Sequence, residues 1–165
     1  MDERLKRFYY EVKKYTEGVH YLNKGIDYDS IKLYEEKYGI NIPNTLKEFL
    51  QESNGGELFA LPAGINIAGI LGGEKRRKGI FYLEDNFDIS KRFCGMPTSM
   101  FILADLNDGE IVGFDLNRST LEDGCVIQWD PESAKIIEEW SSLYDWLNCV
   151  MEEGTELFDY EGNDL

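Results

Sequence analysis

The spacing of apolar residues along the chain predicts four helices. In residues 2–16 the apolar side chains fall three and four positions apart, which places them on one face of a helix. The same period predicts helices within residues 29–39, 44–54 and 142–154. A Ser-x-x-Asp capping pattern stands at the start of the last helix. Helices are therefore expected at both ends of the chain.

The two central helices meet at a corner that the sequence marks on both sides. Gly39 follows the last apolar residue of the first helix, where a left-handed residue commonly ends a helix. Pro43 suits the first turn of the next helix, because its missing N–H needs no helical partner there. Asn44 or Thr45 could cap this second helix, and Thr45 with Glu48 matches the spacing of a capping box.

Between residues 58 and 93 the pattern is less regular. Residues 58–71 read as two strands separated by a turn at 62–64. Residues 72–79 form a loop with the basic run Lys75 to Lys78, which indicates a solvated loop or, alternatively, a contact with an anion or a partner. Residues 80–83 begin a strand or a helix. Residues 84–93 predict a short helix with its two phenylalanines, Phe87 and Phe93, facing inward.

The clearest strand pattern follows residue 100. Residues 101–105 and 111–115 flank Asp108 and Gly109, and Asp-Gly supplies the positive φ angles of a tight hairpin turn. Residues 125–129 predict a further strand. Residues 133–140 are either another extended segment or a lead into the last helix. Helices followed by strands and a final helix favour an α+β domain with a mostly antiparallel sheet.

The helical corner and the strands after it resemble the SUKH superfamily. The pattern E-x-x-Y-G, I-P, L-K-E-F-L and N-G-G is carried by Glu35, Tyr38, Gly39, Ile42, Pro43, Lys47, Glu48, Phe49, Leu50, Asn54, Gly55 and Gly56. A hairpin and strand that recur in the family are matched by Asp105, Asp115, Val126, Trp129 and Asp130, with Ala104 where the family often has glycine. The resemblance implies one SUKH-like domain over residues 1–165, with a core at about 29–152. The residues of the tail, 155–165, include four acidic and no basic side chains, so we expect a frayed acidic end, although Leu157, Phe158 and Tyr160 could dock on the domain.

Composition narrows the choice of partner. The formal net charge is −15, from 17 basic and 32 acidic residues. This excess disfavours binding to nucleic acid or a membrane surface and favours a basic protein. The N-terminal residues lack the apolar segment of a signal peptide, and the three widely spaced cysteines suggest free thiols. We therefore expect a cytoplasmic protein.

Catalytic and metal-binding patterns find little support in the chain. His20 is the only histidine and belongs to no nucleophile motif, and the cysteines lack paired zinc-ligand spacing. The acidic hairpin 105–110 departs from the calcium-loop register. Asp105 and Asp115 could in principle form an acid–base pair. We expect no catalytic residues, no metal and no cofactor.

A binding function remains. Bacterial members of the SUKH superfamily resemble this chain in having a single domain, and they are thought to bind and neutralise a toxin, often a nuclease. The resemblance thus implies an immunity protein whose partner is a basic cognate toxin. We expect the immunity protein itself to be a monomer or a weak homodimer. The alternatives are a regulatory or scaffold module of the Smi/Knr type and a small-ligand-binding domain. Candidate toxin contacts in loops and at strand ends are Glu57, Tyr82, Glu84, Asp85, Asp88, Asp108, Glu110 and Asp130.

Overall fold

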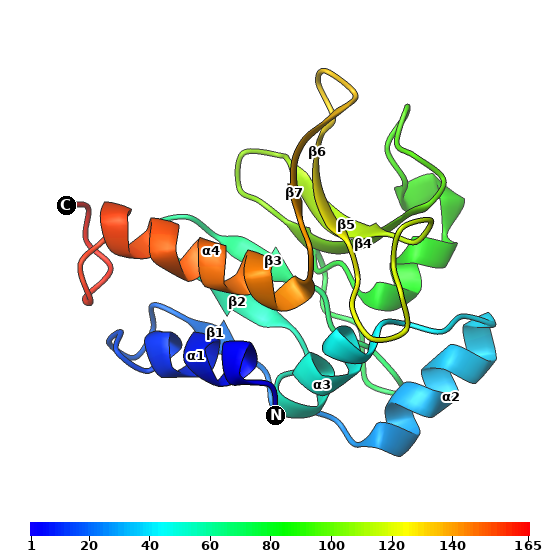
Figure 1. Cartoon of the computed structure of the whole chain (residues 1–165), viewed down its shortest axis with the longest axis horizontal. Helices are drawn as coiled ribbons and strands as arrows, with labels where there is room; N and C mark the ends of the chain where they lie inside the picture. The colour runs from blue at the N-terminus through cyan, green and yellow to red at the C-terminus, as the bar shows by residue number, and fades with distance from the viewer.

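A computed structural model describes residues 1–165 and shows one α+β domain, as predicted (Figure 1). The helices are α1 (Glu3–Val12), α2 (Tyr28–Tyr38), α3 (Asn44–Glu52) and α4 (Leu143–Leu157). The strands are β1 (Tyr21–Leu22), β2 (Gly56–Leu58), β3 (Ile65–Ile67), β4 (Met100–Asp105), β5 (Ile111–Asp115), β6 (Val126–Asp130) and β7 (Lys135–Trp140). Two short 3-10 helices, η1 (Leu83–Phe87) and η2 (Ile89–Lys91), separate β3 from β4.

The seven strands form one antiparallel sheet in which each strand pairs with its neighbours in the chain, in the order β1 to β7. Consecutive connections in such a meander alternate between the two ends of the sheet. The β2–β3, β4–β5 and β6–β7 connections therefore share one end. This arrangement decides which of the candidate residues lie near one another.

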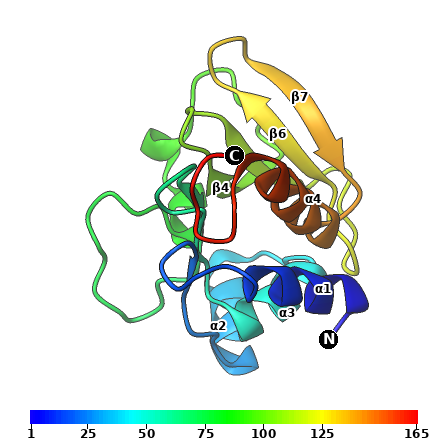
Figure 2. The ribbon, with the colours of Figure 1, turned by 90° about the vertical axis from the view of Figure 1, so that its left-hand side faces the viewer.

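The helices cover one face of the sheet and leave the other partly open. α1 and α4 lie side by side over that covered face (Figures 1 and 2). The larger hydrophobic cluster lies between helices and sheet and holds 28 buried residues, whereas the cluster on the opposite face holds six. We call this opposite face the open face. The smaller cluster is formed there by Met96, Met100, Ile102, Ile111, Ile127 and Trp129.

The helical corner forms as predicted, but its cap does not. Gly39 ends α2 with a φ of 64°. The predicted cap of α3 is wrong, because the helix begins after Pro43 without a side-chain cap and the Thr45 hydroxyl is buried without a partner. Glu48 instead accepts a hydrogen bond from the Tyr144 hydroxyl and pairs with the N-terminal amino group at 3.1 Å. The carboxylate of Glu48, which the local pattern assigned to a capping box, is thus used in tertiary contacts.

The hairpin of β4 and β5 joins the predicted strands through a different turn. Its loop runs from Leu106 to Glu110, and within it only Gly109 has a positive φ, of 93°. Asp108 does not adopt the left-handed conformation that a tight two-residue turn requires. Its carboxylate accepts from the N–H of Glu110 at 3.1 Å. The prediction of a hairpin is confirmed and that of its turn type is wrong.

The C-terminal part is more ordered than predicted. Ser142 caps α4 as predicted, since its hydroxyl accepts from the N–H of Asp145 at 3.2 Å, but the helix continues through Gly154 to Leu157. The following residues do not fray. The carbonyl of Tyr160 accepts from the N–H of Thr16 at 2.8 Å. The tail therefore docks beside the start of the chain.

Several helices and strands differ in extent from the prediction. α1 ends at Val12 instead of residue 16, and two of its side chains, Leu5 and Phe8, are fully buried, so the core extends to the N-terminal side of residue 29. The polar connection 18–28 contributes β1. Residues 135–140 are extended as β7, which confirms one of the two alternatives for residues 133–140. The expected helix at 84–93 is two 3-10 turns. Its phenylalanines, Phe87 and Phe93, are half-exposed instead of facing inward.

Candidate functional site

A row of polar side chains crosses four strands of the open face. Strand register places Tyr21 opposite Glu57, Glu57 opposite Asn66, and Asn66 opposite Asp105. Cross-strand partners point to the same face of a sheet. The residues beside them in sequence, such as Leu58, belong to the core on the helix side. We call these four side chains the polar row.

A groove of about 810 Å³ lies over the polar row. One wall is the connection from β1 to α2, which includes Lys24. The other wall is the segment from Glu74 to Tyr82, where Lys75 and Arg77 line the space. Residues 72–79, which we call the basic loop, project from the body at the left of Figure 2. The groove therefore has carboxylates on its floor and cations along its rim.

The floor carries a carboxylate that is poorly solvated. Asp105 is half-buried, and its one hydrogen bond comes from the amide nitrogen of Asn66 at 3.2 Å. Burial raises the pKa of Asp105 above its ordinary value, and the hydrogen bond from Asn66 opposes this shift. Neither Asp105 nor Glu57 forms an ion pair within the protein.

Two of the candidate toxin contacts fix the basic loop in place. Glu84 accepts from the N–H groups of Leu71 and Gly72, each at 3.0 Å. The carboxylate of Asp85 is buried and accepts hydrogen bonds from Nη1 and Nη2 of Arg76, each at 2.8 Å, and from Nζ of Lys91 at 2.6 Å. Burial acts to raise the pKa of Asp85, but these hydrogen bonds outweigh it and lower the pKa to about 2.

The remaining candidates lie in two places. Tyr82 lines the groove with Glu57, although its side chain is buried and its hydroxyl accepts from the N–H of Arg77 at 3.2 Å. Asp88 caps η2. The other three, Asp108, Glu110 and Asp130, lie at the end of the sheet shared by the β4–β5 and β6–β7 loops. Their role in binding a toxin stays a prediction.

The family-like motif residues support the fold. Tyr38 stacks on Phe87 with ring centroids 4.2 Å apart. The carboxylate of Glu35 accepts from the N–H of Ile42 at 2.8 Å and pairs with Lys47 at 3.0 Å, which closes the corner from inside. Fully buried side chains complete it, among them Ile42, Leu46, Phe49 and Leu50.

The Asn-Gly-Gly segment brings three backbone stretches together. The amide of Asn54 binds both backbone polar groups of Ile70, each at 2.8 Å. A Cβ at Gly55 would lie 2.4 Å from the carbonyl oxygen of Ile67, and one at Gly56 would lie 2.3 Å from that of Tyr21. Only glycine allows these approaches. The motif thus positions β1 and β3 on either side of β2, under the groove.

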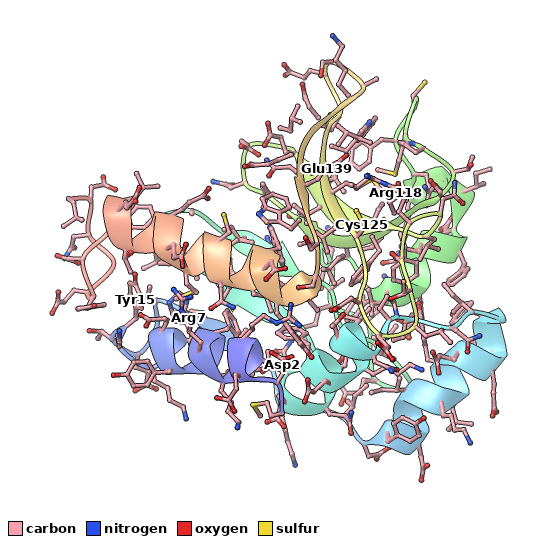
Figure 3. The ribbon with its side chains drawn as sticks, in the orientation of Figure 1. Asp2, Arg7, Tyr15, Arg118, Cys125 and Glu139 are labelled. Carbon is pink, nitrogen blue, oxygen red and sulfur yellow. The ribbon has the colours of Figure 1, made fainter.

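Asp105 and Asp115 do not form an acid–base pair. Asp105 lies opposite Ile111 and Asp115 lies opposite Met100, so the two carboxylates are at opposite ends of the β4–β5 hairpin. Asp115 pairs with Arg118 at 2.8 Å, and Arg118 also binds Glu139 at 2.9 Å, close to Cys125 (Figure 3). This ion-pair group ties the β5–β6 connection to β7.

Other chemical groups are dispersed. No three His, Cys, Asp or Glu side chains come together as a group that could hold a metal ion. His20 packs edge-on against Tyr15 and Phe59, and burial lowers its pKa to about 4. No helix is long and apolar enough to cross a bilayer.

Sequence reasoning missed several groove residues. Lys24 and Asn66 were not predicted as site residues, because each is a single polar residue in a short segment, and Arg77 was noted only as part of the basic run Lys75 to Lys78. The alternation Ile65-Asn66-Ile67 did contain a signal, since it turns the asparagine away from the core. Its neighbours in the polar row could not be identified without the register.

Comparisons with known proteins agree with this architecture. The family model described as SMI1/KNR4 family (SUKH-1) matches residues 25–149. No curated protein matches the chain. Among solved structures, a crystal structure of a protein from Pseudomonas syringae pv. tomato has a TM-score of 0.60 and 19% identity, and the match covers 89% of this chain and 98% of that chain. Likeness at this identity shows the fold alone.

Proposed function

The chain belongs to the SMI1/KNR4 family (SUKH-1), and from this premise we propose that it is a non-catalytic immunity protein that neutralises a cognate toxin by direct binding. In this proposal it acts in the cytoplasm, needs no cofactor and binds one basic toxin, for example a nuclease. The observation that carries the proposal is the unpaired negative charge of its surface.

Most carboxylates of this protein have no cation beside them. Eleven of the 32 acidic side chains form ion pairs, which leaves 21 without one. No basic residue follows Lys135, whereas nine acidic residues do. A toxin that cleaves nucleic acid needs a basic cleft for its substrate, and an acidic protein is attracted to such a cleft. The charge thus supports a basic protein as partner.

The first experiment is a pull-down of the tagged protein from its own cells at low salt and again at high salt. We expect one basic partner with a toxin-like domain that high salt releases, because electrostatic attraction between proteins is screened. The purified partner should then be inhibited at a one-to-one ratio. A protein recovered alone under both conditions, or a partner that stays active when bound, would contradict the proposal.

A charge-reversal series tests where the toxin binds. The test variant changes four accessible candidate acids to lysine, and its control changes four exposed acids elsewhere, so that both have the same net charge. The test set is Glu57, Asp88, Asp108 and Glu110, and the control set is Glu17, Glu36, Glu122 and Glu156. We expect the Kd to rise at least roughly tenfold more in the test variant. An equal rise in Kd in the two variants would show that the interface lies elsewhere.

The groove favours a second candidate, a small-ligand-binding domain. Its volume of about 810 Å³ falls within the range of small-molecule sites, which is roughly 300–1,000 Å³. Native mass spectrometry of the protein purified from its own cells distinguishes the two. A bound compound of constant mass would favour the ligand-binding domain, and the unliganded mass alone would count against it.

A further inference from the structure

The floor of the groove presents oxygen atoms that no group in the protein satisfies. Glu57 takes part in no side-chain hydrogen bond or ion pair, and Asp105 accepts only from Asn66. The amide nitrogen of Asn66 donates to Asp105 and to the carbonyl of Gly64, each at 3.2 Å, while its Oδ1 receives no donor. Three neighbouring side chains thus offer acceptors that the protein's own donors leave free.

Asp105 differs from the other shielded carboxylates of this protein. Glu35 is buried and pairs with Lys47 at 3.0 Å, and Asp85 is buried and pairs with two cations. Asp105 is half-buried and has no cation. Burial of an ionised carboxylate is unfavourable unless an opposite charge or several hydrogen bonds compensate. A cation that enters the groove from outside would supply the opposite charge that Asp105 lacks within the protein.

The spacing of the polar row suits a planar cation. Glu57 and Asp105 flank Asn66, each one strand away, so their backbones are roughly 10 Å apart. Tyr21 extends the row beyond Glu57 and exposes its ring to the groove. A guanidinium group has five N–H donors in a plane and stacks on aromatic rings, whereas an ammonium group is a compact point charge. The row therefore favours arginine over lysine.

We propose that the groove receives one arginine side chain of the partner protein, with the guanidinium over Asn66 between the carboxylates of Glu57 and Asp105 and its stem against Tyr21. The identification of the partner as a protein rests on the function proposed above. Lys75 and Arg77 at the rim repel a run of basic residues, so the arginine is expected to be flanked by neutral or acidic residues.

The test uses Nα-acetylarginine amide as a probe of the purified full chain. Its control is Nα-acetylcitrulline amide, which keeps the shape and loses the charge. Nitrogen–proton NMR spectra follow the side-chain amide of Asn66 during titration. We expect saturable shifts at Asn66 and in β2 to β4 with the arginine probe, and binding at least roughly tenfold weaker for the citrulline probe.

A double variant and its matched control test whether the arginine probe binds in the groove. Glu57→Gln with Asp105→Asn should weaken arginine binding at least roughly tenfold, because both charges are lost while the shapes remain. The matched control, Glu36→Gln with Glu122→Gln, removes two exposed charges elsewhere and should leave binding unchanged. Shifts scattered over the acidic surface, equal binding of citrulline, or unaltered affinity in the groove variant would each overturn the inference.

The outcome separates this inference from the proposed function. An inhibited toxin together with no arginine binding in the groove would leave the immunity function standing and refute the arginine site. Arginine binding that depends on Glu57 and Asp105, without any toxin partner, would support the site and refute the function from which its natural partner was inferred.

Discussion

Adding one methyl group to α4 should destabilise this protein, although the same change normally stabilises a helix. Glycine inside a helix costs about 1 kcal/mol relative to alanine. At Gly154, however, a Cβ would lie 2.0 Å from Cζ of Phe59 and within 2.8 Å of two further ring atoms. Carbon atoms in contact are about 3.5 to 4.0 Å apart, so the ring would have to retreat by about 1.5 Å or more.

The surroundings of Phe59 leave the ring no such space. It is buried, and the rings of His20, Tyr15 and Phe158 lie 4.6, 5.3 and 5.5 Å from it between centroids. Overpacking of a well-filled core costs up to about 3 kcal/mol. Subtracting the helix gain of about 1 kcal/mol, we expect Gly154→Ala to lower the free energy of unfolding by about 2 kcal/mol.

Urea unfolding followed by tryptophan fluorescence measures this difference, and a double-mutant cycle assigns its cause. In a Phe59→Leu background the ring is gone, so Gly154→Ala should cease to destabilise and approach the gain expected for a helix. Thr155→Ala, at the exposed neighbouring position, serves as the control for helix propensity. A more stable Gly154→Ala single variant would refute the packing argument.

Three further predictions concern buried polar groups. Burial lowers the pKa of folded His20 to about 4 from an ordinary 6.5, so the free energy of unfolding should fall as the pH drops from 6.5 towards 4. The loss should be about 1–2 kcal/mol, because the side chain is partly exposed. Urea midpoints should show this pH dependence in the wild type and lose it in His20→Gln. The ionised carboxylate of Asp85, whose folded pKa is about 2, stabilises the fold fully above its ordinary pKa of 3.8 and ceases to do so as the pH falls through 2. At pH 7 Asp85→Asn should lower the free energy of unfolding by about 2 kcal/mol and speed amide exchange in the basic loop, because two cations lose their partner. Unchanged amide exchange would contradict this role of Asp85. Asn86 binds both backbone polar groups of Ile102 at 2.6 and 2.9 Å, so Asn86→Ala should cost about 3 kcal/mol in the same urea assay, and a loss below about 1 kcal/mol would show that water replaces the amide.

Features whose cause is local could be predicted from the sequence. The turn after α2 depends on one residue, Gly39, which takes the left-handed conformation, and the start of α4 depends on the hydroxyl of Ser142. Features decided by distant contacts could not. The Thr45 and Glu48 pattern has the spacing of a cap, yet Glu48 is engaged by Tyr144, almost a hundred positions away. Likewise Gly154 has the look of a helix end in the sequence, yet it lies inside α4, where the ring of Phe59 leaves no room for a Cβ.

The groove shows why a binding site on a sheet is harder to predict than the sheet. Glu57, Asn66 and Asp105 are separated by long stretches of sequence, and only the pairing of β2, β3 and β4 aligns them. Slipping one strand by a single residue would turn its polar side chain towards the core and bring an apolar one to the groove. Asn54 and the two glycines after it hold this register through backbone contacts. A motif made of structural residues therefore determines the chemistry of the groove without contributing a charge to it.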